Sequence, residues 1–236
     1  MRRLILFLVM FLACTCWVQA KTYVVCIGVA DYPSKGKDLH LCVNDAQSVK
    51  DLYEKNKNAD ACLLKNEQAT ISNVCSAMQK YFLQSGVDDA IVFFFSGHGC
   101  PGSFSCYDGE LKYEIIKEIM NNSKAARKIV FADACYAGKA RSSKKRSVAH
   151  TSTDVMFFLS SRTNEMSIEY TSWKHGLFTA YLTKGLRGGA DENRDRVITA
   201  KELFNYVSKG VAEASKDEQH PVMWGNFDGN MPLMVW

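Results

Sequence analysis

The stretch Lys128–Gly138, which reads KIVFADACYAG, indicates the fold of this 236-residue chain. Its apolar run Ile129–Phe131 contains no turn residue, as is typical of a buried strand in a parallel sheet. A carboxylate, Asp133, and a thiol, Cys135, follow this run and precede a glycine turn at Gly138. Because open α/β sheets carry their reactive groups at the carboxyl ends of the strands, the stretch predicts a functional site beside Cys135.

A second stretch with the same pattern lies upstream. Ile91–Phe95 (IVFFF) is an apolar run, and Ser96–Gly99 (SGHG) follows it directly. If the two predicted strands are neighbours in one sheet, His98 and Cys135 leave adjacent strand ends and can face each other.

Strand-like and helix-like segments alternate along the rest of the chain. Apolar runs predict strands and amphipathic segments predict helices. We expect strands over Thr22–Val29, Ala61–Leu64, Val155–Ser160 and Met231–Val235, and helices over Val43–Lys55, Thr70–Gln84, Lys112–Asn121, Gly176–Leu186 and Ala200–Ser215. This order predicts an α/β fold in which a mostly parallel sheet is flanked by helices on both faces. Since no internal repeat or low-complexity linker is present, residues 21–236 are expected to form one domain.

The first 20 residues predict a secretory signal peptide. Arg2 and Arg3 supply a positive start, Leu4–Ala13 an apolar core, and Val18–Ala20 a cleavage site of small residues. The apolar run is shorter than the ~20 residues that a spanning helix needs, so no stable membrane span is expected after leader removal. The expected location is therefore secreted or periplasmic. A lipid-anchored form, suggested by Leu12–Cys14 (LAC), is the less favoured alternative.

The charge balance argues against nucleic-acid binding. The whole chain has 29 basic and 25 acidic residues, a formal net charge of +4. Without Arg2 and Arg3 it would have 27 basic residues and a net charge of +2. That value is far from the basic excess of nucleic-acid-binding domains.

Seven cysteines lie beyond the predicted leader, and an odd number leaves at least one thiol unpaired in an exported chain. No CxxC pair is present among them, which argues against a zinc site and against a dithiol oxidoreductase. Cys100 and Cys106 flank a short loop that contains Pro101 and Gly102. Either a small disulfide or two free thiols would fit this spacing.

His98 and Cys135 together favour nucleophilic catalysis. A thiol is a strong nucleophile as the thiolate, and a neighbouring imidazole can take its proton. The backbone N–H groups of Gly99 and Cys135 could receive the oxyanion of a tetrahedral intermediate. The predicted reaction is therefore acyl transfer from a peptide bond to Cys135, followed by hydrolysis. Taken alone, a buried Cys more often serves packing and a loop His is more often solvated, but the pair at two strand ends favours catalysis.

The two strand-end stretches, SGHG (Ser96–Gly99) and DACYAG (Asp133–Gly138), resemble those of the caspase-like cysteine peptidases. The metacaspase and bacterial branch of this clan is the best match. Two further stretches agree in the same order along the chain, LCVNDA (Leu41–Ala46) and HGLFTAYLTKGLRG (His175–Gly188). The resemblance therefore extends over residues 22–207.

This resemblance implies both a fold and two catalytic roles. The fold would be a caspase-like three-layer sandwich. His98 would act as general base and general acid, and Cys135 would be the nucleophile. The QAC-type motif of true caspases is absent from the sequence.

The resemblance also implies a substrate preference. In the metacaspase-like branch, the aspartate two residues before the Cys and the aspartate of the CxNDA motif line the S1 pocket. Here these residues are Asp133 and Asp45, with Ser96 beside the base and Ser160 at a pocket wall. Two carboxylates select a cationic side chain through charge-assisted hydrogen bonds, so we expect peptide or protein substrates with Arg or Lys before the scissile bond. For Asp45, capping of the following helix is the alternative interpretation.

Residues 139–153 (KARSSKKRSVAHTST) interrupt the alternating pattern with a basic, hydroxyl-rich stretch. Such a composition predicts a mobile surface loop beside the strand that carries Cys135. A peptidase specific for basic residues could cut itself there, which would make the chain a zymogen. A solvated charge run is the alternative interpretation. The candidate self-cleavage positions are Lys139, Arg141, Lys144, Lys145 and Arg146.

A calcium site is the less favoured of two interpretations of residues 191–202. The side chains at EF-hand positions 1, 3, 5 and 12 are Asp191, Asn193, Asp195 and Glu202. Position 6, however, is Arg196 instead of the glycine that turns such a loop. Thr199 and Glu202 also match the capping box that starts a helix. We therefore expect that no cofactor is required.

A second function is compatible with the same fold. A catalytically weak caspase-fold homologue could act as a binding or scaffold module. The presence of both His98 and Cys135 favours the enzyme, an exported cysteine endopeptidase, over this module.

Overall fold

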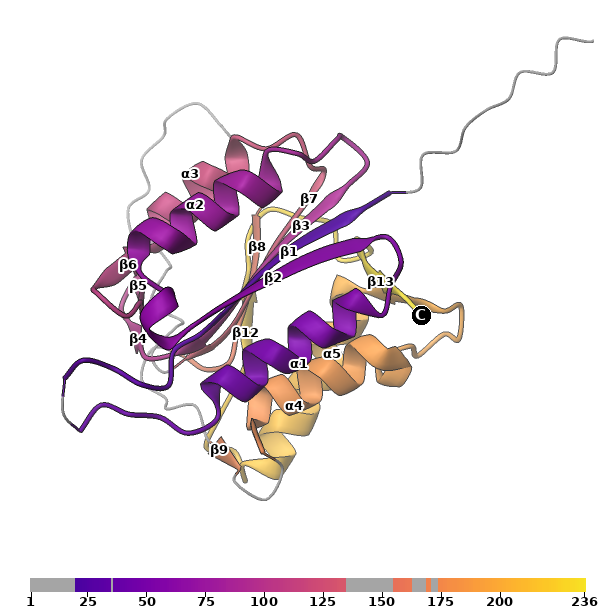
Figure 1. Cartoon of the computed structure of the whole chain (residues 1–236). Helices are drawn as coiled ribbons and strands as arrows, with labels where there is room; N and C mark the ends of the chain where they lie inside the picture. The colour runs from indigo at the N-terminus through magenta and orange to yellow at the C-terminus, as the bar shows by residue number, and fades with distance from the viewer. Residues whose placement is uncertain (1–19, 35, 135–154, 163–168, 171–173) are drawn as a thin grey trace, which may run out of the picture.

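The computed structural model describes residues 20–34, 36–134, 155–162, 169–170 and 174–236 (Figure 1). Six strands form its central sheet. From one edge to the other they are β12 (Val222–Trp224), β8 (Val155–Leu159), β7 (Arg127–Ala134), β3 (Ala90–Gly97), β1 (Thr22–Gly28) and β2 (Ala59–Lys65). Five of these strands run parallel, and β12 alone is antiparallel to its neighbour β8.

Helices cover both faces of the sheet, so the fold has three layers (Figure 1). On one face lie α2 (Ile71–Phe82) and α3 (Tyr113–Asn121). On the other face lie α1 (Cys42–Glu54), α4 (Leu177–Lys184) and α5 (Ala200–Ala214). The α/β fold predicted from the alternating pattern, with a mostly parallel sheet between two helical layers, is confirmed.

Short strands form three further small sheets outside the central sheet. They are the meander β4 (Gly99–Cys100), β5 (Ser103–Ser105) and β6 (Glu110–Lys112), the pair β9 (Glu169–Tyr170) and β10 (His175–Gly176), and the pair β11 (Val197–Thr199) and β13 (Pro232–Val235). The chain also forms a 3-10 turn at Asn66–Gln68 and a π-helical turn at Gly185–Gly189. The predicted C-terminal strand therefore exists, but it pairs with β11 outside the central sheet. The edge strand β12 was not predicted, because three residues are too few to show a period.

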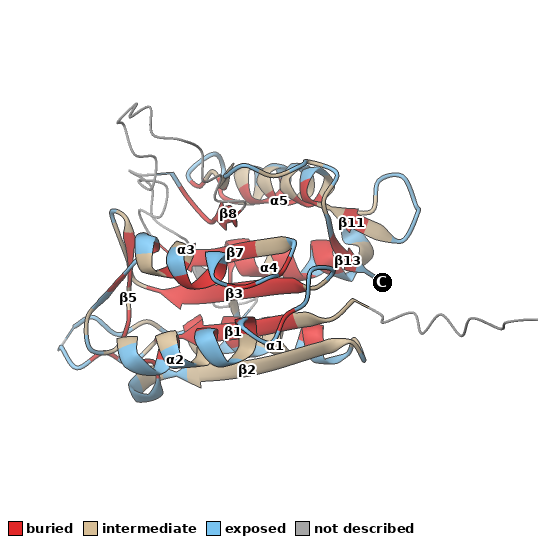
Figure 2. Ribbon diagram, turned by 90° about the horizontal axis from the view of Figure 1, so that it is seen from above, coloured by how far each residue is buried: buried red, intermediate tan, exposed pale blue. Residues whose placement is uncertain are grey.

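The alternation of side chains along the central strands produces two hydrophobic cores. In β1, Val25 and Ile27 pack toward α2 and α3, whereas Val24 and Cys26 pack toward α1. The three parallel strands at the centre are buried on both faces (Figure 2). Because each fully buried aliphatic or aromatic side chain contributes roughly 1.5–3 kcal/mol, these runs dominate the stability of the sheet. They also hold the ends of β3 and β7 rigidly side by side.

Two of the helices begin with side-chain caps, and the second of them, at α5, is the capping box predicted from the sequence. The Thr70 hydroxyl accepts a hydrogen bond from the N–H of Asn73 at 3.2 Å and starts α2. Thr199 and Glu202 form a complete capping box at the start of α5. Such caps satisfy backbone N–H groups that have no partner within the helix.

Among the described residues, no helix has both the length and the apolar character that a membrane span would need.

Candidate active site

The predicted catalytic residues follow two strands that are paired in register. β3 and β7 run parallel, and Gly97 at the end of β3 is the Cα partner of Ala134 at the end of β7. His98 therefore leaves the sheet beside the point from which the chain continues to Cys135. Cys135 itself lies outside the described residues, as do the five basic positions of the 139–153 stretch and residues 1–19 of the predicted leader.

The His98 side chain is half-buried, and its ring is oriented by a backbone carbonyl. Its Nε2 lies 2.7 Å from the carbonyl oxygen of Lys37. Because a carbonyl oxygen can only accept, Nε2 is the nitrogen that carries the hydrogen. In the neutral ring, Nδ1 then holds the lone pair. The imidazole is thus prepared to take a proton at Nδ1.

Gly99, the predicted oxyanion residue, begins the β4–β6 meander. It is paired with Phe104 of β5, and the carbonyl of His98 accepts a hydrogen bond from the N–H of Ser105 at 2.9 Å. The meander therefore continues directly from the base and holds its backbone.

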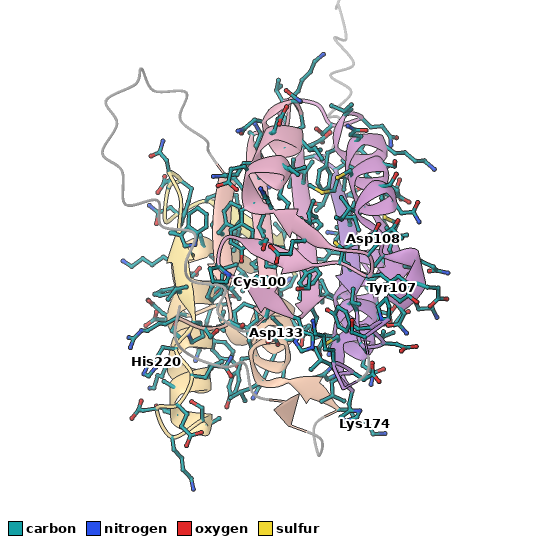
Figure 3. All side chains as sticks on the ribbon, turned by 90° about the vertical axis from the view of Figure 1, so that its left-hand side faces the viewer. Cys100, Tyr107, Asp108, Asp133, Lys174 and His220 are labelled. Atoms are coloured by element: carbon teal, nitrogen blue, oxygen red, sulfur yellow. The ribbon has the colours of Figure 1, made fainter. Side chains whose placement is uncertain are left out.

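A cavity of about 590 Å³ opens between this meander and the loop that precedes α1. His98, Tyr32, Lys37, Cys100, Tyr107 and Asp108 are among its lining residues. Figure 3 looks onto this carboxyl edge of the sheet, with Cys100 and Asp133 near the middle of the view and Tyr107 and Asp108 to one side. His98 thus has direct access to a hollow that could receive part of a substrate.

Cys100 and Cys106 are free thiols in the structure, so the disulfide interpretation of their spacing is not observed. Burial raises the pKa of Cys106 to about 12, which makes it a poor nucleophile. The half-buried Cys100 lies 3.6 Å from the hydroxyl of Ser105.

Asp45, one of the two predicted specificity residues, lies buried in the first turn of α1. The carboxylate accepts hydrogen bonds from Ser96 Oγ at 3.0 Å, from the N–H of Gly176 at 3.1 Å, and from His175 Nδ1 at 3.0 Å. Burial raises the pKa of Asp45 above its ordinary value, and these three hydrogen bonds oppose that rise. The helix-cap alternative for Asp45 is wrong, because the N-cap residue of α1 is Leu41, which makes no side-chain cap, and the Asp45 carboxylate binds groups from other elements.

Asp133, the second predicted specificity residue, is buried at the carboxyl end of β7. Its Oδ2 accepts from the N–H of Thr179 at 3.0 Å and from the Thr179 hydroxyl at 2.8 Å. Thr179 lies in the first turn of α4, where backbone N–H groups have no helical partner. The positive end of the α4 dipole therefore stabilises both carboxylates, since Asp45 binds the N–H of Gly176 at the same helix start.

Gly176 lies between the two carboxylates, and its lack of a side chain lets both of them approach closely. A Cβ atom at this position would lie 2.3 Å from Asp133 Oδ2 and 3.1 Å from Asp45 Oδ2. The structure thus joins three residues that the sequence predicted for one pocket, Asp45, Ser96 and Asp133. The structure adds His175, Gly176 and Thr179 to the site, three residues of the stretch HGLFT (175–179) for which the sequence predicts no individual role. Their position before an amphipathic helix could have indicated a carboxylate-binding helix start.

Ser160, predicted for a pocket wall, is bound to the backbone of β7, and its place at a wall stays a prediction. Its side chain is fully buried, and its hydroxyl both accepts from the N–H and donates to the carbonyl of Ala134, each at 3.0 Å. Gln219 in turn donates to the Ser160 carbonyl at 2.9 Å. Ser160 therefore holds the backbone immediately before Cys135.

The predicted calcium residues are engaged with the chain itself. The side chains of Asp191, Asn193 and Asp195 accept hydrogen bonds from the backbone N–H groups of residues 195–197. Glu202 Oε2 accepts from both the N–H and the hydroxyl of Thr199. Among the described residues, no group of three or more His, Cys, Asp or Glu side chains could hold a metal ion. The calcium interpretation stays a prediction.

Comparison with known proteins gives a family assignment. A family model described as the caspase domain matches residues 21–230. No curated protein matches the chain at a significant level. Among solved structures, protein GSU0716 from Geobacter sulfurreducens is similar, with a TM-score of 0.68 and 16% sequence identity over 91% of this chain and 99% of that chain. Caspase-1 from Spodoptera frugiperda is similar with a TM-score of 0.66 and 14% identity, covering 92% of this chain and 90% of that chain.

Proposed function

The chain belongs to the caspase-domain family, and from this premise we propose that it is a cysteine endopeptidase that cleaves peptide bonds after Arg or Lys. One observation carries the proposal: the in-register strand ends at Gly97 and Ala134, with the His98 ring held by the Lys37 carbonyl. The proposed base, His98, thus has its lone pair on Nδ1 and lies beside Ala134, the residue that precedes the Cys135 thiol in the chain.

The first chemical step transfers an acyl group to the thiol. His98 Nδ1 takes the proton of the Cys135 thiol, and the sulfur attacks the scissile carbonyl carbon. A C–S bond forms while the carbonyl oxygen becomes an oxyanion, which the N–H groups of Gly99 and Cys135 would receive. The imidazolium then gives its proton to the leaving nitrogen, and the C–N bond breaks.

The second step is hydrolysis of the thioester. Neutral His98 takes a proton from a water molecule, whose oxygen attacks the acyl carbon. The C–S bond breaks, the carboxylic product leaves, and the proton returns to the sulfur. The carbonyl of Lys37 supports both steps, because it keeps the second nitrogen of the ring protonated and leaves Nδ1 available.

The preference for a cationic side chain is supported by the buried pair Asp45 and Asp133. Among the described residues, no Lys or Arg neutralises Asp45, whose partners there are the Ser96 hydroxyl, the Gly176 amide and the imidazole of His175. A guanidinium or ammonium group approaching this pair would gain charge-assisted hydrogen bonds at low dielectric constant. An acidic side chain would meet like charge instead.

Two further parts of the proposal concern the chain before it becomes active. Residues 1–20 would direct export to a secreted or periplasmic location, and their removal would leave a mature chain beginning at Lys21. The five basic positions Lys139, Arg141, Lys144, Lys145 and Arg146 would then be sites of self-cleavage. Both ideas are supported by sequence pattern.

Cleavage of short fluorogenic peptides tests the function directly. Four peptides that differ only in having Arg, Lys, Asp or Asn before the reporter are incubated with the full chain and with its Cys135→Ala variant. We expect release from the Arg or Lys peptide only, and none with the variant. Release after Asp or Asn alone, or equal release by the variant, would contradict the proposal. Binding of a peptide without any turnover would favour the scaffold module instead.

Self-processing needs a separate experiment. The wild type and the Cys135→Ala variant are produced in a host without basic-specific peptidases and compared on denaturing gels. We expect two fragments from the wild type and one intact chain from the variant. Mass spectrometry of the fragments identifies the position that was cut. Two fragments from both chains would exclude self-cleavage.

A further inference from the structure

We propose that Tyr32 is a positioning residue for His98, an inference that rests on the function proposed above. The Tyr32 hydroxyl bridges two backbone groups. It accepts a hydrogen bond from the His98 N–H at 2.9 Å and donates one to the Ser105 carbonyl at 3.0 Å. A phenolic hydroxyl has a single hydrogen to donate, so this geometry uses its donor and one acceptor position.

These contacts close a ring of three hydrogen bonds around the proposed base. The N–H of Ser105 donates to the His98 carbonyl at 2.9 Å, while the Ser105 carbonyl receives the Tyr32 hydroxyl. His98 is therefore held at both its N–H and its C=O. The residue cannot shift along the strand direction without breaking at least one of these bonds.

Tyr32 is closely packed against His98 and Gly97. The rings of Tyr32 and His98 are in contact, with centroids 4.9 Å apart and planes inclined by 42°. A Cβ atom at Gly97 would lie only 2.8 Å from the Tyr32 hydroxyl oxygen. Because Gly97 has no side chain, the Tyr32 hydroxyl can come close enough to bind the N–H of His98.

The environment keeps the bridge intact over a wide pH range. Tyr32 is only 9% exposed, and burial raises its pKa far above the ordinary value. The hydroxyl therefore stays protonated wherever a Cys–His pair works, and it continues to donate to Ser105.

Tyr32 and the Lys37 carbonyl fix different parts of the same residue. Lys37 orients the ring through Nε2, and Tyr32 fixes the backbone from which the ring projects. Both lie in the loop between β1 and α1. Since general-base catalysis depends on geometry within a fraction of an ångström, a loosened backbone is expected to lower the rate of the chemical step more than substrate binding.

A matched pair of tyrosine variants tests this role in the full chain. Tyr32→Phe removes the bridging hydroxyl and keeps the ring. Tyr53→Phe, in α1, removes a buried hydroxyl that has no hydrogen-bond partner among the described residues. With the Arg peptide, we expect Tyr32→Phe to lower kcat about 10-fold with KM within about twofold, and Tyr53→Phe to leave both unchanged. Both variants are assayed well below their melting temperatures. Equal kcat values for the two variants would overturn the proposal.

A second measurement is independent of catalysis. Loss of the hydroxyl exposes the His98 N–H to solvent exchange, so hydrogen exchange at this amide, followed by NMR, should accelerate about 10-fold in Tyr32→Phe and not in Tyr53→Phe. Unchanged exchange at His98 would also overturn the positioning role. If the wild type cleaves no peptide and exchange nevertheless accelerates, the contact is established and the proposed function is the part that fails.

Discussion

Asp45 Oδ1 and His175 Nδ1 lie 3.0 Å apart although 130 residues separate them in the chain. Asp45 belongs to the first turn of α1, and His175 to β10, the short strand before α4. The side chain of Asp45 is buried, whereas that of His175 is 29% exposed. The pair therefore reaches from the protein interior to the surface.

Replacing Asp45 by Asn tests its proposed role in substrate choice. The amide keeps the size of the carboxylate but loses its charge, so we expect kcat/KM for the Arg peptide to fall roughly 100-fold, mainly through KM. Steady-state kinetics with the Arg and Lys peptides measure this change. Asp51→Asn on the exposed side of the same helix is the control and should retain activity. Equal losses in both variants would exclude a role for Asp45 in specificity.

The same substitution predicts a pH-dependent effect on stability. The pKa of Asp45 is raised from 3.8 by burial, so the folded chain holds this proton more tightly than the unfolded chain does. The contribution of Asp45 to the free energy of unfolding is therefore largest below the unfolded pKa, and it falls as pH rises through the folded pKa. Asp45→Asn cannot titrate at this position. Its Tm relative to wild type should accordingly increase in thermal melts as the pH rises above about 4. A constant difference in Tm would contradict the raised pKa.

Gly176→Ala should disrupt the acidic pair. The added methyl group would lie 2.3 Å from Asp133 Oδ2, so the carboxylate or the start of α4 must move. We expect a loss of about 2–3 kcal/mol in the free energy of unfolding, measured with denaturant, and at least a 100-fold fall in kcat/KM. Gly229→Ala is the matched control, because its Cβ would lie 3.7 Å from the nearest atom. A Gly176→Ala chain as active as this control would show that the pair tolerates displacement.

Ser160→Ala tests the support of the backbone before Cys135. The substitution leaves the buried N–H of Ala134 without the Ser160 hydroxyl, which should cost about 1–3 kcal/mol of stability. We expect kcat to fall with KM nearly unchanged, because the Ser160 hydroxyl holds the backbone that leads to Cys135. Ser161→Ala removes a longer hydrogen bond of 3.4 Å to the Ala134 carbonyl and should have the smaller effect. A larger loss of stability and kcat in Ser161→Ala than in Ser160→Ala would disprove the role of Ser160 as the backbone support.

Removal of calcium should leave activity unchanged. The side chains at the EF-hand-like positions already accept backbone N–H groups, and Glu202 belongs to the capping box of α5. We expect dialysis against EGTA to alter cleavage of the Arg peptide by less than about twofold. A large loss that calcium restores and magnesium does not would instead support the calcium interpretation.

Much of the fold was predictable from local pattern. The apolar runs of β3 and β7 have few turn residues and no polar interruption, and strands buried on both faces require such runs. Helix starts were also readable, because the caps at Thr70 and Thr199 act within three residues. By contrast, β12 and the two-residue strands are too short to carry a period, and their pairing partners are distant in sequence.

The candidate site was predictable in part. Strand-end position marked His98, Asp133 and Ser96, and the family resemblance added Asp45. The sequence did not reveal that Ser160 binds the backbone of Ala134, because a serine after a strand has no pattern that distinguishes a pocket wall from a backbone support. The roles of Tyr32 and of the Lys37 carbonyl were likewise not predictable. Both depend on hydrogen bonds to or from backbone groups, which every residue type can make.

The buried strand segments, the order in which strands and helices alternate, and the residues that follow the strand ends can be read from the amino-acid sequence. These features depend on side-chain polarity and short-range spacing, which are properties of the chain. The contacts of Asp45 with His175 and Gly176, and of the His98 ring with Lys37, exist only in the folded chain. Such contacts arise where the sheet register and the packing of α1 against α4 bring distant segments together, and hydrogen bonds between them form only at those crossings.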